Sequence, residues 1–78
     1  MERERVESTT MKSVGYQAED KTLEIEFQSG MVYQYLGVGV EVYEGLLQSN
    51  SKGQYFNSEI RDGYECVRLS AQRRAARR

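Results

Sequence analysis

The chain has 78 residues, of which 38% are hydrophobic, 29% charged and 10% aromatic, and its formal net charge is −1. This composition is too apolar for a disordered polymer and too polar for a membrane span, so it predicts one small globular domain. There is no histidine and only one cysteine, Cys66, which excludes histidine general bases, Cys/His metal clusters and disulfide frameworks.

The charges divide the chain into an acidic body and a basic tail. The last six residues hold four of the eleven cations: Arg73, Arg74, Arg77 and Arg78. Residues 1–72 keep seven cations against twelve anions, a net charge of −5. This asymmetry points to an acidic partner, such as nucleic acid, for the tail alone.

A single domain is predicted over residues 6–69, with a short segment at each end. Residues 1–5 are a balanced run of Glu and Arg, and residues 70–78 have no apolar stripe with which to dock. We therefore expect both ends to be mobile. No apolar run approaches the ~18 residues of a membrane span, and no secretory leader opens the chain, so the expected location is the cytoplasm.

Three strands are predicted in the first half of the chain. In the clearest of them, three apolar residues alternate strictly with polar ones: Leu23, Ile25 and Phe27. Such alternation requires one buried and one solvated face. The strand before it contains Gly15, which is expected to mark a bulge. Together, residues 11–18, 23–28 and 31–36 form a three-stranded antiparallel meander.

The loop between the second and third strands decides which face Tyr33 and Tyr35 occupy. If the loop is only Ser29-Gly30, both tyrosines lie opposite glutamates and form an exposed platform. If the loop is Gln28-Ser29-Gly30, they lie opposite the apolar residues of the second strand and join the core. The longer loop is favoured, because Gly30 suits its left-handed position, whereas a two-residue type I′ turn prefers Asn or Asp where Ser29 stands.

After Gly39 the spacing of apolar residues changes to that of a helix. An apolar stripe predicts a helix at about residues 40–49: Val40, Tyr43, Leu46 and Leu47. Asn50 can end this helix in the left-handed conformation.

A second helix is predicted from Ser51-Lys52-Gly53-Gln54, which has the pattern of a capping box. In this helix Phe56 and Ile60 share one face, and Gly63 is a natural stop. Residues 64–69 are compatible with a short fourth strand. The predicted class is therefore α+β, a three-stranded antiparallel meander with two helices packed on one face.

The sequence offers no catalytic or cofactor site. Gly37-Val38-Gly39 matches the start of a dinucleotide fingerprint, but Val42 stands where the third glycine belongs and the neighbouring strands are antiparallel. The carboxylates are explained by turns, helix starts and the solvated face of the second strand. We therefore expect a non-enzymatic protein that binds no metal, cofactor or small-molecule substrate.

Six tyrosines and two phenylalanines are many for a chain of this size. A small domain uses aromatic residues first to fill its core, and this role accounts for Tyr43 and Phe56. Proteins that bind single-stranded nucleic acid instead stack bases on sheet aromatics beside a cationic groove. Here the cations lie mainly in the tail, with Lys52, Arg61 and Arg68 as candidates on the body.

Short motifs follow one another over residues 6–69: Gly15-Tyr16, Leu23-Glu24-Ile25-Glu26-Phe27, Ser29-Gly30, Tyr33-Gln34-Tyr35, Gly37-Val38, Ser51-x-Gly53, Tyr55-Phe56-Asn57, Ile60-Arg61 and Tyr64. This series resembles the KTSC domain, a short module at the C-terminus of some lysyl-tRNA synthetases and in stand-alone small bacterial proteins. The family's central Y-x-Y falls on Tyr33 and Tyr35. The resemblance implies a link to RNA and supplies no catalytic residue. Relatives often carry proline where Gly39 stands, so the first helix loses a preset first turn.

The expected function is that of a small accessory module, of unestablished role, that contacts RNA. The candidate contact residues are Tyr33, Tyr35, Arg61, Arg73, Arg74, Arg77 and Arg78. The alternative is a module that binds another protein or itself. It would use an unpaired edge strand, or the second face of the sheet, where Val32 and Leu36 are expected to be exposed.

Overall fold

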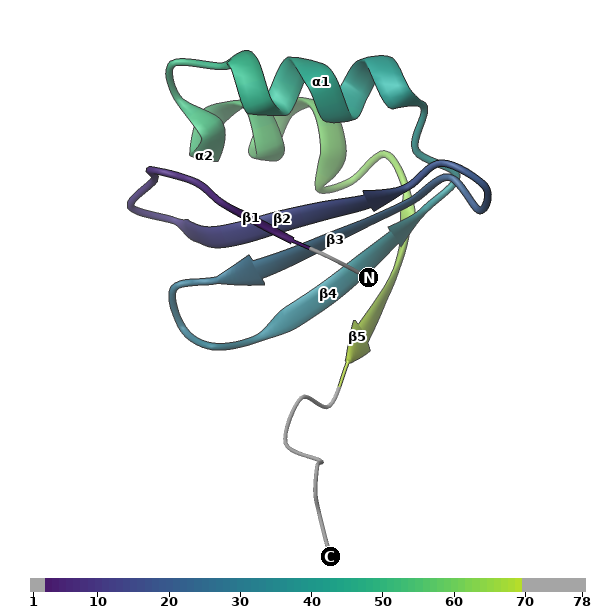
Figure 1. Cartoon of the computed structure of the whole chain (residues 1–78), viewed down its shortest axis with the longest axis horizontal. Coiled ribbons are helices and arrows are strands. Elements are labelled where there is room, and N and C mark those ends of the chain that lie inside the picture. Colours follow the sequence, from purple (N-terminus) through teal and green to yellow (C-terminus); the bar gives the residue numbers. More distant parts are fainter. Residues whose placement is uncertain (1–2, 70–78) are drawn as a thin grey trace, which may run out of the picture.

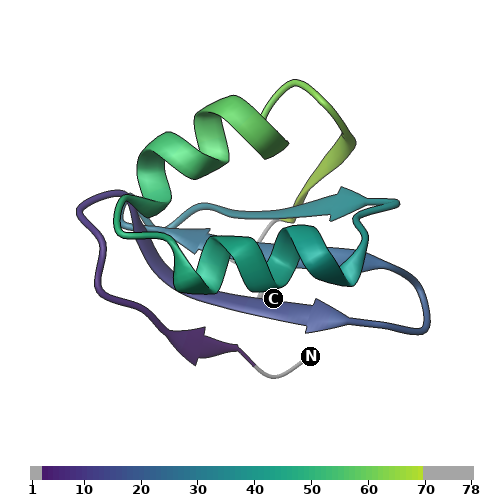
Figure 2. The same cartoon turned by 90° about the horizontal axis from the view of Figure 1, so that it is seen from above.

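The computed structural model describes residues 3–69, which form a five-stranded antiparallel sheet with helices on one face (Figure 1). In chain order the elements are β1 (Glu4–Arg5), β2 (Met11–Gln17), β3 (Thr22–Phe27), β4 (Val32–Leu36), α1 (Val40–Gln48), α2 (Lys52–Tyr55), the π-helical turn η1 (Phe56–Ile60) and β5 (Glu65–Leu69). The strands lie side by side in the same order as in the sequence. Seen from above, α1 and the α2–η1 segment both cover the sheet (Figure 2). The α+β class and the two helices on one face are confirmed.

The sheet has two more strands than the predicted meander. β5 takes the place of the expected fourth strand and pairs antiparallel with β4. β1 pairs with β2, so Glu4 and Arg5 belong to the sheet, although the sequence predicted a domain that starts only at residue 6. A strand of two residues is too short to show the alternation of apolar and polar residues by which a strand is predicted. Its position depends on contacts distant in sequence, including a bond from the Val6 N–H to the Lys12 carbonyl at 3.1 Å. The predicted mobile tail, residues 70–78, lies outside the described residues.

The predicted bulge exists, but at another residue. The pairing of β2 with β3 shifts between Met11 and Ser13, not at Gly15. With Lys12 as the extra residue, Met11 and Val14 both point toward the helices although they are three positions apart. Both side chains are fully buried.

The register of β3 against β4 confirms the three-residue loop. Ile25 lies opposite Tyr33 and Leu23 opposite Tyr35. The Phe27 N–H donates to the Met31 carbonyl at 2.9 Å, and Gly30 has φ +95°, where glycine alone is unstrained. Both tyrosines therefore lie on the face of the sheet that the helices cover.

The expectation that Val32 and Leu36 would be exposed on the second face is wrong. Val32 is only 4% exposed and Leu36 is half-buried. The reason is β5, which places Leu69 opposite Val32 and Glu65 opposite Leu36. The second face therefore has no open apolar patch on β4.

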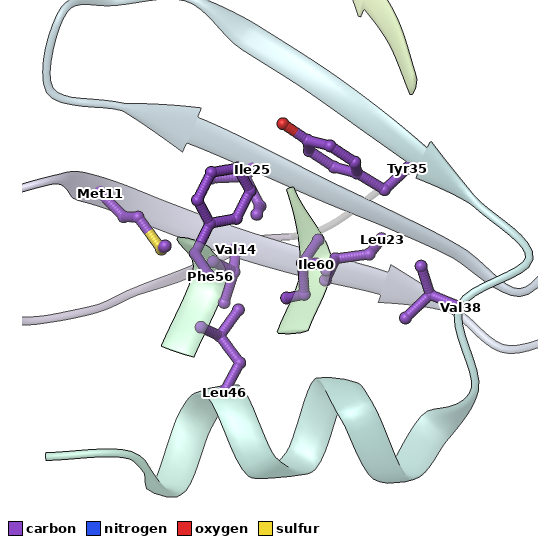
Figure 3. Close-up of a cluster of buried hydrophobic side chains, with 9 residues drawn as sticks. All are labelled: Met11, Val14, Leu23, Ile25, Tyr35, Val38, Leu46, Phe56 and Ile60. Carbon is purple, nitrogen blue, oxygen red and sulfur yellow. The ribbon is translucent and has the colours of Figure 1, made fainter. Parts of the chain in front are cut away.

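The core lies between the sheet and the helices (Figure 3). Its members come from three strands, both helical segments and the β4–α1 connection: Met11, Val14, Leu23, Ile25, Tyr35, Val38, Leu46, Phe56 and Ile60. α1 contributes Leu46, which is fully buried, whereas Val40 at the start of the predicted stripe is 47% exposed. Val38 fills the core at that end instead, because Gly39 is still extended and α1 starts only after it.

The helix ends differ from the predicted caps. Asn50 does not have a positive φ, so the predicted left-handed end of the first helix is wrong. The second helical segment ends at Ile60, before the predicted stop at Gly63. α2 does begin directly after Ser51, but the Ser51 side chain makes no capping hydrogen bond. In η1 the Arg61 N–H reaches the Phe56 carbonyl five residues back at 2.9 Å. This wide turn keeps Phe56 and Ile60 on the same buried face.

We predict that Tyr35→Ala will lower the free energy of unfolding by about 3–5 kcal/mol, as truncation of a core aromatic does. Tyr35 is only 5% exposed, whereas Val40 is 47% exposed and serves as the control. Val40→Ala should change stability by less than about 0.5 kcal/mol. Chemical denaturation of both variants measures the difference. A surface-like loss for Tyr35→Ala would contradict the register.

Candidate functional site

The structure describes three of the seven candidate contact residues. Tyr33 and Tyr35 lie on β4 and face the helices. Arg61 directly follows η1 and is exposed. The four candidate arginines of the tail lie outside the described residues.

Tyr33 and Tyr35 belong to a cluster of four aromatic rings. Tyr35 meets Phe56 edge to face with 5.5 Å between ring centroids, and Phe56 meets Phe27 in the same way at 5.3 Å. Phe27 in turn contacts Tyr33 at 5.7 Å, and the two tyrosines lie 6.4 Å apart. Such edge-to-face packing is the favoured geometry for buried rings. Tyr35 is therefore a core residue, while the half-buried Tyr33 keeps part of its ring accessible.

The β4–β5 pairing adds two residues that the sequence did not place here. Arg68 lies opposite Tyr33, and Cys66 opposite Tyr35. Paired residues of an antiparallel sheet share a face, so Arg68 is on the same face as Tyr33. Within residues 3–69, neither Arg68 nor Arg61 forms an ion pair. We use the name tyrosine–arginine edge for Tyr33 and Arg68, which share a face of the sheet, together with Arg61, which follows η1. The group combines an accessible ring with two exposed cations.

The pKa of Tyr35 depends on its burial and on the residues around it. Burial raises the pKa of its phenol from the ordinary 10.0 to about 12, with smaller contributions in the same direction from Cys66 and Tyr33. The positive charge of Arg61 acts in the opposite direction.

The opposite face of the sheet carries a polar network that the sequence did not predict. Arg3 binds Glu24 at 2.6 Å and approaches Glu26 at 3.9 Å. Gln34 donates to the second oxygen of Glu24 at 2.9 Å, and Ser13 donates to Glu26 at 3.0 Å. Glu24 is only 7% exposed, so this pairing offsets the cost of burying its charge. In the sequence, the alternation of Glu and Arg before residue 6 is the pattern that could have indicated this network.

Two further hollows are polar. One lies between the β1–β2 loop and the α1–α2 junction and is lined by hydroxyl and amide side chains with Lys52. The other is lined by Tyr16, Tyr43, Glu4 and Glu19, with the two tyrosine rings stacked on each other at 4.9 Å.

Over the described range, the structure gathers no three His, Cys, Asp or Glu side chains that could hold a metal ion. No helix in that range is long and apolar enough to cross a membrane.

We predict that Tyr35 will be the last tyrosine to titrate. Because the folded protein holds this phenol proton more tightly than the unfolded chain does, the resulting stability is present below pH 10 and is lost as the pH rises toward 12. Ultraviolet absorbance of the phenolates should show a final step that Tyr35→Phe removes. Tyr33→Phe is the matched control. An unchanged final step in Tyr35→Phe would refute the assignment.

Sequence comparison finds similar proteins in several organisms. An uncharacterized protein of Stutzerimonas stutzeri is 42% identical over 57 residues, which cover 73% of this chain and 80% of that protein. A lysine–tRNA ligase of Nostoc punctiforme is 41% identical over 64 residues, which cover 82% of this chain. That match spans only 11% of the ligase.

A solved structure and a family model both match this chain. The crystal structure of a KTSC domain protein from Yersinia pestis superimposes with a TM-score of 0.83 at 33% identity, over 87% of this chain and 96% of that one. The family model for the KTSC domain matches residues 7–64. The chain therefore belongs to the KTSC domain family.

Proposed function

We propose that this KTSC domain is a non-catalytic accessory module that contacts single-stranded RNA from the β4–β5 side of its sheet. The arginine tail supplies most of the phosphate contacts, and the tyrosine–arginine edge adds a base-stacking ring and two further cations. The observation that carries the proposal is the pairing of Tyr33 with Arg68 on the strand that leads into the tail.

The first support is the chemistry at this edge. An aromatic ring beside arginine is the combination with which proteins bind single strands, since bases stack on the ring and the guanidinium pairs with phosphate. Tyr33 is half-buried, so it can offer part of its ring without leaving the aromatic cluster. Tyr35 is confined to the core and takes no direct part.

The second support is the distribution of charge. Glu24 and Glu26 lie on the face away from the tyrosine–arginine edge, and Arg3 partly neutralises them. The body as a whole still carries a net charge of −5 over residues 1–72. Affinity for a polyanion must therefore come from the tail, with Arg61 and Arg68 setting where on the domain the strand lies.

The third support is the setting of the relatives. A lysine–tRNA ligase acts on an RNA, and the ligase of Nostoc punctiforme contains a stretch 41% identical to this chain. The stretch is a small part of that enzyme. An accessory RNA contact is a role that such a stretch can keep both inside an enzyme and on its own.

We predict that affinity for single-stranded RNA will fall as salt rises, because each neutralised phosphate releases condensed counterions. Four arginine contacts give a slope of log affinity against log salt of at most about −2.8 from the tail. Deleting residues 73–78 should flatten the slope by that amount. The melting temperature should stay nearly the same, since the buried core is built from residues 11–60. Fluorescence anisotropy with a labelled oligonucleotide measures the slope.

Variants of the body distinguish binding at the tyrosine–arginine edge from a general effect of positive charge. Arg61→Gln and Arg68→Gln should each weaken binding, whereas Arg5→Gln, an exposed arginine on the far edge of the sheet, should not. Equal binding by the truncated and the full chain would exclude the tail as the contact. If neither form binds RNA at physiological salt, the proposal fails and a protein-binding role replaces it.

A further inference from the structure

Beside β1, the sheet and α1 border a hollow of about 850 Å³, which we call the β1–α1 hollow. Pockets that hold small ligands have volumes of roughly 300–1,000 Å³. Figure 2 shows β1 at the margin of the sheet, beside α1 and not beneath it. The lining includes two aromatic rings, two carboxylates and one guanidinium: Tyr16, Tyr43, Glu4, Glu19 and Arg3. The proposed RNA contact uses none of these residues.

The aromatic part of the lining is a pair of stacked tyrosine rings. Tyr16 of β2 and Tyr43 of α1 have ring centroids 4.9 Å apart, and their planes are 12° from parallel. The Tyr16 hydroxyl donates to the Val38 carbonyl at 2.6 Å, which holds this ring in place. Both tyrosines are half-buried, so each keeps part of its surface accessible. The face of an aromatic ring is its negative side and attracts cations.

Two carboxylates join these rings in the lining. Glu4 lies opposite Val14 in the β1–β2 pairing, and Val14 points toward the helices, so Glu4 is on the same face of the sheet as Tyr16. Glu19 belongs to the turn after β2 and is exposed. Within residues 3–69, neither Glu4 nor Glu19 forms an ion pair. Both charges are therefore available to a ligand.

The guanidinium of Arg3 also lines the hollow, but its charge is already paired. It binds Glu24 at 2.6 Å and approaches Glu26 at 3.9 Å, on the face of the sheet away from the helices. An anionic ligand in the hollow would meet Glu4 and Glu19. A neutral apolar ligand would remove water from these carboxylates without pairing them, which costs free energy. The lining therefore selects a cation that also has apolar surface.

We propose that the β1–α1 hollow binds an alkylammonium group, with its nitrogen at the Glu4 and Glu19 carboxylates and its alkyl chain on the rings of Tyr16 and Tyr43. An ammonium nitrogen has three hydrogen-bond donors and no acceptor, so carboxylates suit it. The methylene chain covers aromatic surface, and the charge near the ring face adds a cation–π attraction. Free polyamines and the lysine side chains of other polypeptides both carry this group. The site is separate from the proposed RNA contact, so one can fail while the other holds.

Titration of the isotopically labelled full chain with n-pentylamine, followed by nuclear magnetic resonance, tests the site. The matched probe is 1-pentanol, which has the same chain length and no charge. We expect pentylamine to shift the ring signals of Tyr16 and Tyr43, and to bind at least about fivefold more tightly than pentanol. Two further probes distinguish the sources of the group. Tighter binding of Nα-acetyl-lysine amide than of 1,5-diaminopentane would indicate a polypeptide lysine, and the reverse order would indicate a free polyamine.

Variants test the two parts of the lining separately. Glu4→Gln and Glu19→Gln should each weaken pentylamine binding about threefold, because each removes one charge and keeps the size of the side chain. Glu65→Gln is the matched control, since Glu65 is exposed and lies on β5, at the opposite edge of the sheet. Tyr43→Leu should weaken binding by a similar factor, whereas Tyr43→Phe keeps the ring and should change binding less than about twofold. Melting curves verify that each variant is folded.

Three outcomes would overturn the proposal. The first is equal binding of pentylamine and pentanol, which would show that the hollow does not select a charge. The second is an equal loss of binding in Glu4→Gln and Glu65→Gln, which would indicate a general attraction of cations to the acidic body. The third is the absence of any shift in the ring signals of Tyr16 and Tyr43 at about 50 mM pentylamine, since that would exclude even a weak site.

Discussion

The hairpin between β3 and β4 closes with the Phe27 N–H donating to the Met31 carbonyl at 2.9 Å, and Gly30 allows the turn with φ +95°. A slip of one residue here would move every side chain of β4 to the other face. Tyr35 would leave its edge-to-face contact with Phe56 at 5.5 Å, and Phe27 on β3 would be the one remaining ring of the cluster in contact with Phe56. The packing of the second helical segment therefore depends in part on a loop at the far end of β4. The same register sets which residues of β5 meet the tyrosines.

The two faces of the sheet bury different kinds of side chain. On the helix-covered face, apolar and aromatic side chains are removed from water. On the other face, Glu24 is nearly as buried, at 7% exposed, and is paired with Arg3 at 2.6 Å. Arg3 stands next to β1, so this ion pair also helps hold the short first strand in the sheet. The cations left without an ion pair in the described range include Arg68, beside Tyr33, and this gives the β4–β5 side its distinct chemistry.

Much of this fold could be predicted from local patterns, because β3, the first helix and the Gly30 loop are specified by residues close together in sequence. The features that could not be predicted depend on distant contacts. β1 has too few residues for a period and depends partly on Arg3 reaching Glu24 from 21 positions away. The bulge formed at Lys12, a residue with no bulge signal, and Gly15 remained regular. For the site, the sequence identified Tyr33, but its pairing with Arg68 required the register of a strand that lies beyond both helices.

The β3–β4 register buries Tyr35 between the sheet and the helices. Nuclear Overhauser contacts of the Tyr35 ring in the labelled full chain test this most directly. We expect contacts with the Leu23 methyl groups and with the Phe56 ring, whose centroid lies 5.5 Å away. Contacts of the Tyr35 ring with the Glu24 side chain, and none with Phe56, would show the opposite register, with Tyr35 on the face away from the helices.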